Sequence, residues 1–269
     1  MPFKAGLYFE TVGVGHPIIF IHGMGLDSHS MKSFYEPLLT QSEQDSLCRI
    51  YLDLPGMGAS EIPHTLYNAD NLVEQINSFS HAIISEQVGL VSHSYGGYLA
   101  LGLLSQFQKS FVAGFLTAPV VIANHATRHV APHKLIIKEK LTDNSDAFAD
   151  YLAMNVVIDS RSWHQYQKLI LPAAQNFNQP FWDTMKTKGT YRLNKETSMA
   201  SLVKQPVTML LGQNDNEVGY MDQLAFAEGH ANIHAQVLQN AGHNLMIDAP
   251  TTVATQFHTF LNSLFINLD

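Results

Sequence analysis

The chain has 269 residues, of which 46% are hydrophobic and 14% are charged, so it can bury a sizeable core and global disorder is not expected. Acidic residues outnumber basic ones 23 to 15, which gives a formal net charge of −8. No block of lysine and arginine offsets this charge, so a nucleic-acid partner is not expected. The same balance disfavours polyanionic substrates, although a local pocket can differ from the whole. One α/β domain is the expectation for this length.

The targeting and redox features predict a soluble cytoplasmic protein. The single cysteine, Cys48, cannot form an internal disulfide and lies in an apolar run typical of a buried strand. The first residues lack a charged start followed by a long apolar stretch, so no secretory signal is expected. No apolar run approaches the roughly 18 residues of a membrane span, so membrane insertion is not expected either.

Short apolar runs alternate with longer amphipathic stretches through the first 119 residues. Strands are predicted at 7–11, 17–22, 47–54, 88–92 and 111–117. Helices are predicted at 30–40, 69–85 and 95–107. Such alternation is typical of a mostly parallel sheet with helices on both faces, in which ligands bind where the strands end.

The alternation of predicted strands and helices stops between residues 120 and 204, where no convincing strand pattern is present. Helices are expected there at 146–159, 161–171 and 180–188. Strands then return at 207–211 and 235–238, with helices at 221–228 and about 250–265. We therefore predict an α/β core formed by 1–119 and 205–269. A helical cap at 120–204 is inserted after the sixth core strand and lies over the strand ends.

Ser94 is the predicted nucleophile. The segment SHSYGG at 92–97 follows a predicted strand and opens a predicted helix, which is the setting of a nucleophile elbow. So tight a turn needs small residues two positions before and after the serine. Gly96 fills the second position, whereas Ser92 replaces the glycine usual in the first. An ordinary helix N-cap serine is the alternative interpretation of Ser94.

The segment HGMG at 22–25 directly follows a strand and is the predicted oxyanion loop. Its glycines let the backbone approach a substrate, and a tetrahedral intermediate needs preorganised N–H donors. We predict the amides of Met24 and Tyr95 as these donors, with an ordinary glycine turn as the alternative. His22 and Gly23 are assigned to the wall of the substrate pocket.

His243 is the predicted general base among 14 histidines, because it lies on a loop after the last strand, from which it can reach a serine. His93 is its main rival, but the turn should direct that side chain elsewhere, into packing or the pocket wall. Asp215 follows the strand at 207–211 and is the predicted orienting acid. Glu217 is the alternative candidate for the orienting acid, and Asp222 is a weaker one.

No metal site is expected. His125, His129 and His133 recur every four residues, as ligands on a helix would, but Pro132 interrupts that helix and no carboxylate or cysteine completes a set. Asp248, which stands just before the final helix, is interpreted as its cap.

With these segments in place, the chain resembles the α/β-hydrolase superfamily, in particular its capped single-domain, carboxylesterase-like branch. The loop at 22–25 resembles the family's oxyanion loop, and DLPGMGAS at 53–60 resembles its D-x-P-G-x-G-x-S turn. Ser94, Asp215 and His243 occur in the family's order. The resemblance covers nearly the whole chain outside the cap and implies the α/β-hydrolase fold with a Ser-His-Asp triad.

The resemblance also narrows the range of reactions expected for this chain. Epoxide hydrolases and haloalkane dehalogenases of this fold carry aspartate where this chain has Ser94, and the proline-rich oxyanion loop of proline aminopeptidases is absent. The resemblance implies hydrolysis of small to medium carboxylic esters without a cofactor. We expect the protein to be a monomer or homodimer. The alternatives are C–C bond hydrolysis, perhydrolase or haloperoxidase-like chemistry on the same triad, and a non-catalytic small-molecule receptor. Three cap aromatics are assigned to the substrate pocket: Trp163, Phe181 and Trp182.

Overall fold

The computed structural model describes residues 3–63 and 67–266, which contain an eight-stranded sheet in the order β1-β2-β4-β3-β5-β6-β9-β10. The β1–β2 and β2–β4 ladders are antiparallel, and the ladders from β4 to β10 are parallel. The strands are β1 (Phe3–Lys4), β2 (Leu7–Val12), β3 (His16–Ile21), β4 (Leu47–Leu52), β5 (Val88–His93), β6 (Phe111–Thr117), β9 (Val207–Gly212) and β10 (Ile233–Leu238).

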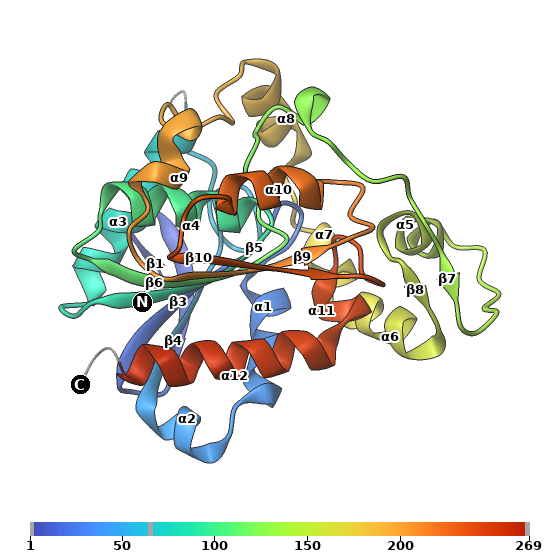
Figure 1. Ribbon diagram of the computed structural model, residues 1–269, viewed down its shortest axis with the longest axis horizontal. Coiled ribbons are helices and arrows are strands. Elements are labelled where there is room, and N and C mark those ends of the chain that lie inside the picture. The colour runs from blue at the N-terminus through green and yellow to red at the C-terminus, as the bar shows by residue number, and fades with distance from the viewer. Residues whose placement is uncertain (1–2, 64–66, 267–269) are drawn as a thin grey trace.

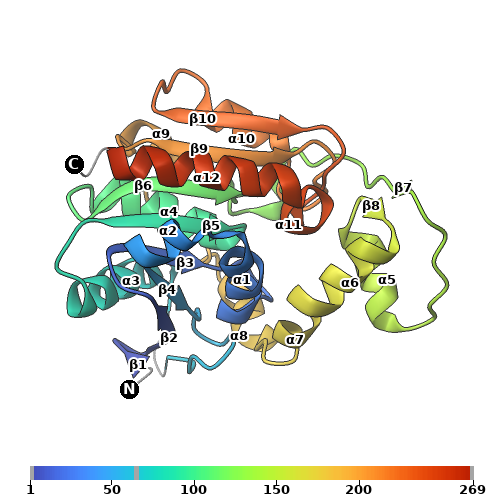
Figure 2. The same cartoon turned by 90° about the horizontal axis from the view of Figure 1, so that it is seen from below.

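Helices cover both faces of this sheet. In Figures 1 and 2, α3, α4 and α10 lie on one face, and α1 and α12 lie on the other. The predicted fold class, a mostly parallel sheet between helices, is therefore confirmed. The helices outside the β6–β9 connection are α1 (Ser28–Tyr35), α2 (Gln41–Ser46), α3 (Ala69–Ile83), α4 (Tyr95–Gln106), α10 (Tyr220–Ala227), α11 (Leu245–Asp248) and α12 (Pro250–Ile266), with a 3-10 turn at η1 (Glu36–Leu38).

The centre of the sheet is apolar on both sides. All six residues of β5 are buried, and so are five of the six in β3. Continuous apolar strands of this kind form where helices cover both faces, because each side chain then packs against one layer or the other. The C-terminal ends of β3 and β5 carry the segments at 22–25 and 92–97, so the sheet brings these two loops together.

The connection from β6 to β9, residues 118–206, is the longest segment between two strands of the sheet. β6 and β9 are neighbouring parallel strands, so both ends of the connection meet the sheet at adjacent positions. Figure 1 shows α5, α6, β7 and β8 beyond the C-terminal ends of β9 and β10. The connection contains η2 (His125–Thr127), β7 (Ile136–Ile137), α5 (Asp146–Met154), β8 (Val157–Ile158), α6 (Ser160–Leu169), α7 (Leu171–Ala174), α8 (Gln179–Thr187), η3 (Glu196–Ser198) and α9 (Met199–Leu202).

Several local features differ from the sequence prediction. The helix predicted at 146–159 ends at Met154, because Val157 and Ile158 pair with β7 as a short parallel strand. The sequence pattern does not predict α2, because all six of its residues are polar and show no apolar spacing; a capping box between Thr40 and Glu43 starts it. The short helix α11 precedes α12. Within the described residues, no helix combines the length and hydropathy that crossing a bilayer requires.

Candidate active site

Ser94 occupies a strained turn between β5 and α4. Its backbone has φ 53° and ψ −120°, a region that a residue with a Cβ rarely adopts. The turn is held from both sides, because the Ser94 amide donates to the Thr117 carbonyl at 3.0 Å and the Ser94 carbonyl accepts from the Val120 amide at 3.0 Å. This is the geometry of a nucleophile elbow, in which the hydroxyl is lifted above the strand ends.

The elbow is packed so closely that larger residues could not be accommodated. A Cβ on Gly96 would lie 2.3 Å from the Ile21 carbonyl oxygen, and a Cβ on Gly23 would lie 2.8 Å from the Cβ of Ser94. Ser92, where the family pattern has glycine, is fully buried, and its carbonyl accepts from the Thr117 hydroxyl at 3.3 Å. The small side chain of Ser92 therefore fits beside the turn.

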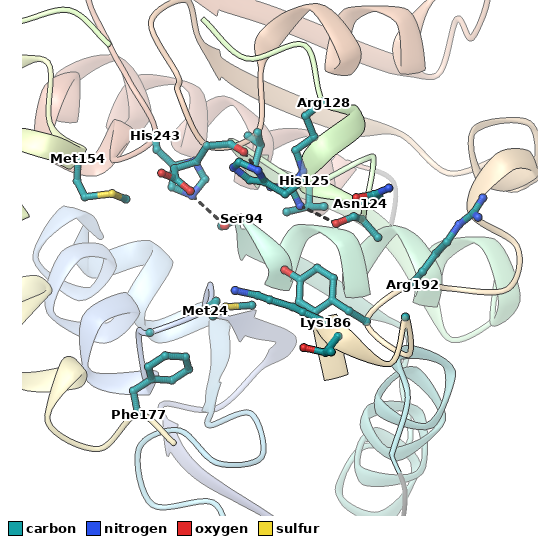
Figure 3. Close-up of a pocket in the computed structure, with 18 residues that line it drawn as sticks. Met24, Ser94, Asn124, His125, Arg128, Met154, Phe177, Lys186, Arg192 and His243 are labelled. Carbon is teal, nitrogen blue, oxygen red and sulfur yellow. Dashed lines mark hydrogen bonds between the residues drawn. The ribbon is translucent and has the colours of Figure 1, made fainter. Parts of the chain in front are cut away.

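The structure brings the three predicted catalytic residues together. His243 Nε2 lies 2.9 Å from Ser94 Oγ, and His243 Nδ1 lies 2.9 Å from Asp215 Oδ2. The other carboxylate oxygen of Asp215 accepts the amides of Glu217 at 2.8 Å and Val218 at 3.0 Å, which fixes its orientation. The exposed fractions of Asp215, His243 and Ser94 are 0%, 6% and 8%. Figure 3 shows the His243–Ser94 contact at the edge of a cavity.

The two ionisable members of this arrangement shift each other's pKa in opposite directions. Burial alone would raise the pKa of Asp215, but the His243 ring and two backbone amides outweigh it and lower that pKa. Burial alone would lower the pKa of His243, but the Asp215 carboxylate outweighs it and raises that pKa above its usual value. The pair therefore favours the imidazolium, the form that His243 takes when it accepts a proton from serine.

The rival residues have other partners. Glu217 lies on the cavity wall, and within the described chain it makes no hydrogen bond to His243. Asp222 accepts from the amide of His129 at 2.7 Å and pairs with its ring at 2.6 Å. The His93 ring bonds to the hydroxyl and carbonyl of Thr117, and burial lowers the pKa of His93 to about 3. None of the three takes the place of Asp215 or His243.

The amides of Met24 and Tyr95 are positioned beside the elbow. Tyr95 is the first residue of α4, so its N–H has no acceptor within the helix. Met24 follows Gly23, which packs against Ser94, and lines the cavity. Among the residues that the structure describes, neither amide donates a hydrogen bond to the protein. Both donors are thus available to an oxyanion beside Ser94.

A cavity of about 950 Å³ lies beside Ser94 and His243. Its wall combines loops of the sheet with residues of the β6–β9 connection, as Figure 3 shows. The lining residues are Met24, Gly25, Ser94, Val120, Ala123, Asn124, His125, Arg128, Met154, Phe177, Lys186, Thr187, Gly189, Tyr191, Arg192, Glu217, Val218 and His243.

The pocket residues expected from the sequence do not line this cavity, which corrects that assignment. The His22 ring is fully buried and joins two loops, donating to the Gly23 carbonyl and accepting the Leu54 amide. Trp182 is fully buried and donates to the Pro55 carbonyl at 3.1 Å. Trp163, Phe181 and Trp182 thus pack in the interior of the connection or against the core. The residues outside the lining are His22, Gly23, His93, Trp163, Phe181 and Trp182.

The structure also bears on two further assignments made from the sequence, those of Asp248 and of the histidines at 125–133. Asp248 does not cap α12; its carboxylate accepts the amides of Gly242 at 2.8 Å, Val157 at 3.0 Å and Val156 at 3.2 Å. The histidines of the 125–133 run have separate roles, since His129 pairs with Asp222, His133 bonds to the Leu152 carbonyl, and His125 lines the cavity. No group of three potential metal ligands is found in the described chain.

The fold, the elbow turn and the cavity at the strand ends define an α/β hydrolase. A sequence model of the alpha/beta hydrolase family matches residues 18–256, and the chain belongs to this family. The chain is similar to a crystal structure of an alpha/beta superfamily hydrolase from Oenococcus oeni PSU-1, with 35% identity, 96% of each chain covered and a TM-score of 0.89.

Two other relatives are more distant. The chain is 26% identical over 260 residues to the biotin biosynthesis bifunctional protein BioHC of Teredinibacter turnerae, and this match covers 91% of the chain but only 44% of that longer protein. A thermophilic esterase from Thermogutta terrifontis, solved with malate bound, is 18% identical with a TM-score of 0.69 over 96% of this chain and 93% of its own. At that identity the likeness shows the fold alone.

Proposed function

We propose that this hydrolase cleaves carboxylic esters through an acyl-enzyme on Ser94. The observation that carries the proposal is the unbroken series of contacts from Ser94 Oγ through the His243 ring to Asp215, with 2.9 Å at each step, at the edge of a cavity. A serine hydroxyl is a weak nucleophile until a neighbouring base accepts its proton, and this geometry supplies the base.

The steps follow from the positions of the side chains. His243 Nε2 accepts the Ser94 proton as Oγ attacks the ester carbonyl, and the amides of Met24 and Tyr95 donate to the oxyanion. Asp215 holds the Nδ1–H tautomer and stabilises the imidazolium. The imidazolium then gives its proton to the departing alcohol, leaving the acyl group on Ser94. Water, deprotonated by His243, attacks the acyl carbonyl, and the acid leaves as Ser94 recovers its proton.

The β6–β9 connection has the position that a cap requires. It supplies Asn124, Arg128, Met154, Phe177 and Lys186 to the cavity wall, so residues 120–204 would enclose the acyl group and limit its size. We place the enzyme in the cytoplasm, as a monomer or homodimer.

A serine-directed fluorophosphonate probe and short-chain nitrophenyl esters test the proposal. Wild-type protein should release nitrophenolate with turnover and should be labelled once, whereas Ser94→Ala should do neither and keep its melting temperature. Ser105→Ala is the matched control, because Ser105 is a buried serine on α4 whose hydroxyl bonds to the Gly102 carbonyl. Labelling of Ser94→Ala would place the nucleophile elsewhere. Folded wild-type protein that binds esters without turnover would favour a receptor.

A further inference from the structure

The cavity differs in charge from the protein as a whole. The chain has a formal net charge of −8, yet three lining side chains, Arg128, Lys186 and Arg192, are cationic, and Glu217 is the one carboxylate among the lining residues. Arg192 pairs with Glu196 at 2.8 Å, and Figure 3 shows it directed away from Ser94. With that pair set aside, two cations, Arg128 and Lys186, face one carboxylate, Glu217, so the lining keeps a net positive charge.

Arg128 is a fixed cation. Its guanidinium donates to the carbonyls of Ile122 at 2.8 Å, Glu217 at 2.8 Å and Ala123 at 3.1 Å. Carbonyls orient the group without neutralising it, and in the described chain no carboxylate forms an ion pair with it. The charge acts within the site, because it opposes the rise in the pKa of His243 that Asp215 causes.

Lys186 is an exposed cation on the opposite wall. It lies near the C-terminal end of α8, is exposed, and makes no ion pair within the part of the chain that is described. Figure 3 shows its side chain reaching from α8 toward Met24 and the centre of the cavity. On the far side of Ser94, the same view places the apolar side chains of Met154 and Phe177. The cavity thus has one apolar side and one cationic side.

We propose that this cavity selects esters that carry an anionic group, a carboxylate or a phosphate, several bonds from the scissile carbonyl. Arg128 and Lys186 bind the anion, while Met154 and Phe177 contact the apolar part of the substrate. The inference rests on the proposed ester hydrolysis. A charge-assisted contact in such a site corresponds to a preference of about 10- to 100-fold in kcat/KM over a neutral ester of equal length.

Matched pairs of esters test this selectivity. One arm compares the mono-nitrophenyl ester of a linear dicarboxylic acid with its methyl-capped neutral counterpart, which places the anion on the acyl side. The second arm compares acetate esters of a hydroxy acid and of its methyl ester, which places the anion on the alcohol side. We expect the charged member to be preferred in one arm. Lys186→Met should reduce that preference at least severalfold, whereas Lys188→Met, two residues away and outside the lining, should not.

The outcomes separate the two proposals. Turnover of neutral esters without preference for the charged member in either arm overturns the anion site and leaves ester hydrolysis standing. Absence of turnover for every ester overturns ester hydrolysis. The anion site is then decided by calorimetric binding of the charged and neutral esters to Ser94→Ala protein, with and without Lys186→Met. Equal binding of both esters overturns it.

Discussion

Replacing Asp248 by asparagine should weaken the fold and the activity together. The Asp248 carboxylate accepts the amide of Gly242 with Oδ2, and those of Val157 and, at 3.2 Å, Val156 with Oδ1. Gly242 precedes His243, whereas Val156 and Val157 belong to the β6–β9 connection. One buried side chain therefore joins the loop of the base to the segment that lines the substrate cavity.

The size of the expected effect follows from the hydrogen bonds that the two carboxylate oxygens of Asp248 accept. Asparagine keeps one oxygen and replaces the other by an NH₂ group, so in either orientation the amide of Gly242 or of Val157 loses its acceptor. A buried donor without an acceptor costs about 1–3 kcal/mol. For a chain of this size the melting temperature should fall by about 2–4 °C per kcal/mol. If the Gly242 amide is the one that loses its acceptor, the neighbouring His243 should shift, and kcat/KM should fall by about 10- to 100-fold.

Thermal unfolding and nitrophenyl ester kinetics on the same preparation measure both effects. Asp222→Asn is the matched control, because Asp222 is also a buried carboxylate that accepts a backbone amide, but its partner is His129 rather than the His243 loop. The control should keep kcat/KM near the wild-type value. An Asp248→Asn protein with unchanged melting temperature and unchanged kinetics would refute the reasoning.

Asp215→Asn should lower kcat by about three to four orders of magnitude through the wrong imidazole tautomer, whereas Glu217→Gln should leave kcat near wild type; the reverse result would reassign the acid. Since His243 must be neutral to accept a proton and Asp215 raises its pKa, kcat/KM should rise with pH through an inflection above about 6.5. Trp182→Ala should destabilise the protein by about 3–5 kcal/mol in chemical denaturation. Phe177→Ala should instead shift the preferred acyl length in an ester panel, and an unchanged profile would remove Phe177 from the acyl site.

Apart from the two-residue strands β1, β7 and β8, the strands and the relative order of the site residues could be predicted from the sequence because their signals are local. An apolar run such as the one that forms β5 can be buried only inside the sheet, and a small-residue turn after it defines the elbow. Asp215 and His243 could be placed because parallel strands end at one edge of a sheet, so residues just after strands meet there.

The pocket could not be predicted, because its composition depends on how the β6–β9 connection is oriented. Trp182 and Phe177 are both aromatic residues near the start of α8, yet Trp182 is buried against Pro55 and Phe177 lines the cavity. Nothing in their local sequence distinguishes the two. Asp248 has the position of a helix cap, but its carboxylate accepts hydrogen bonds from amides about 90 residues away in sequence. Such contacts exist only once the tertiary structure has formed.

Under the proposed mechanism, the same region of the connection would link substrate fit to proton transfer by His243. Met154 lines the cavity, and the next residue, Asn155, accepts a hydrogen bond at 3.1 Å from Asn244, the residue after His243. Asp248 joins the following residues of the connection to Gly242, the residue before His243. His243, the proposed base, is therefore flanked on both sides by residues bonded to the segment that lines the cavity. We therefore expect a ligand that displaces Met154 to shift the support of His243 as well, so that a poorly fitting substrate loses rate in the chemical step and not only affinity.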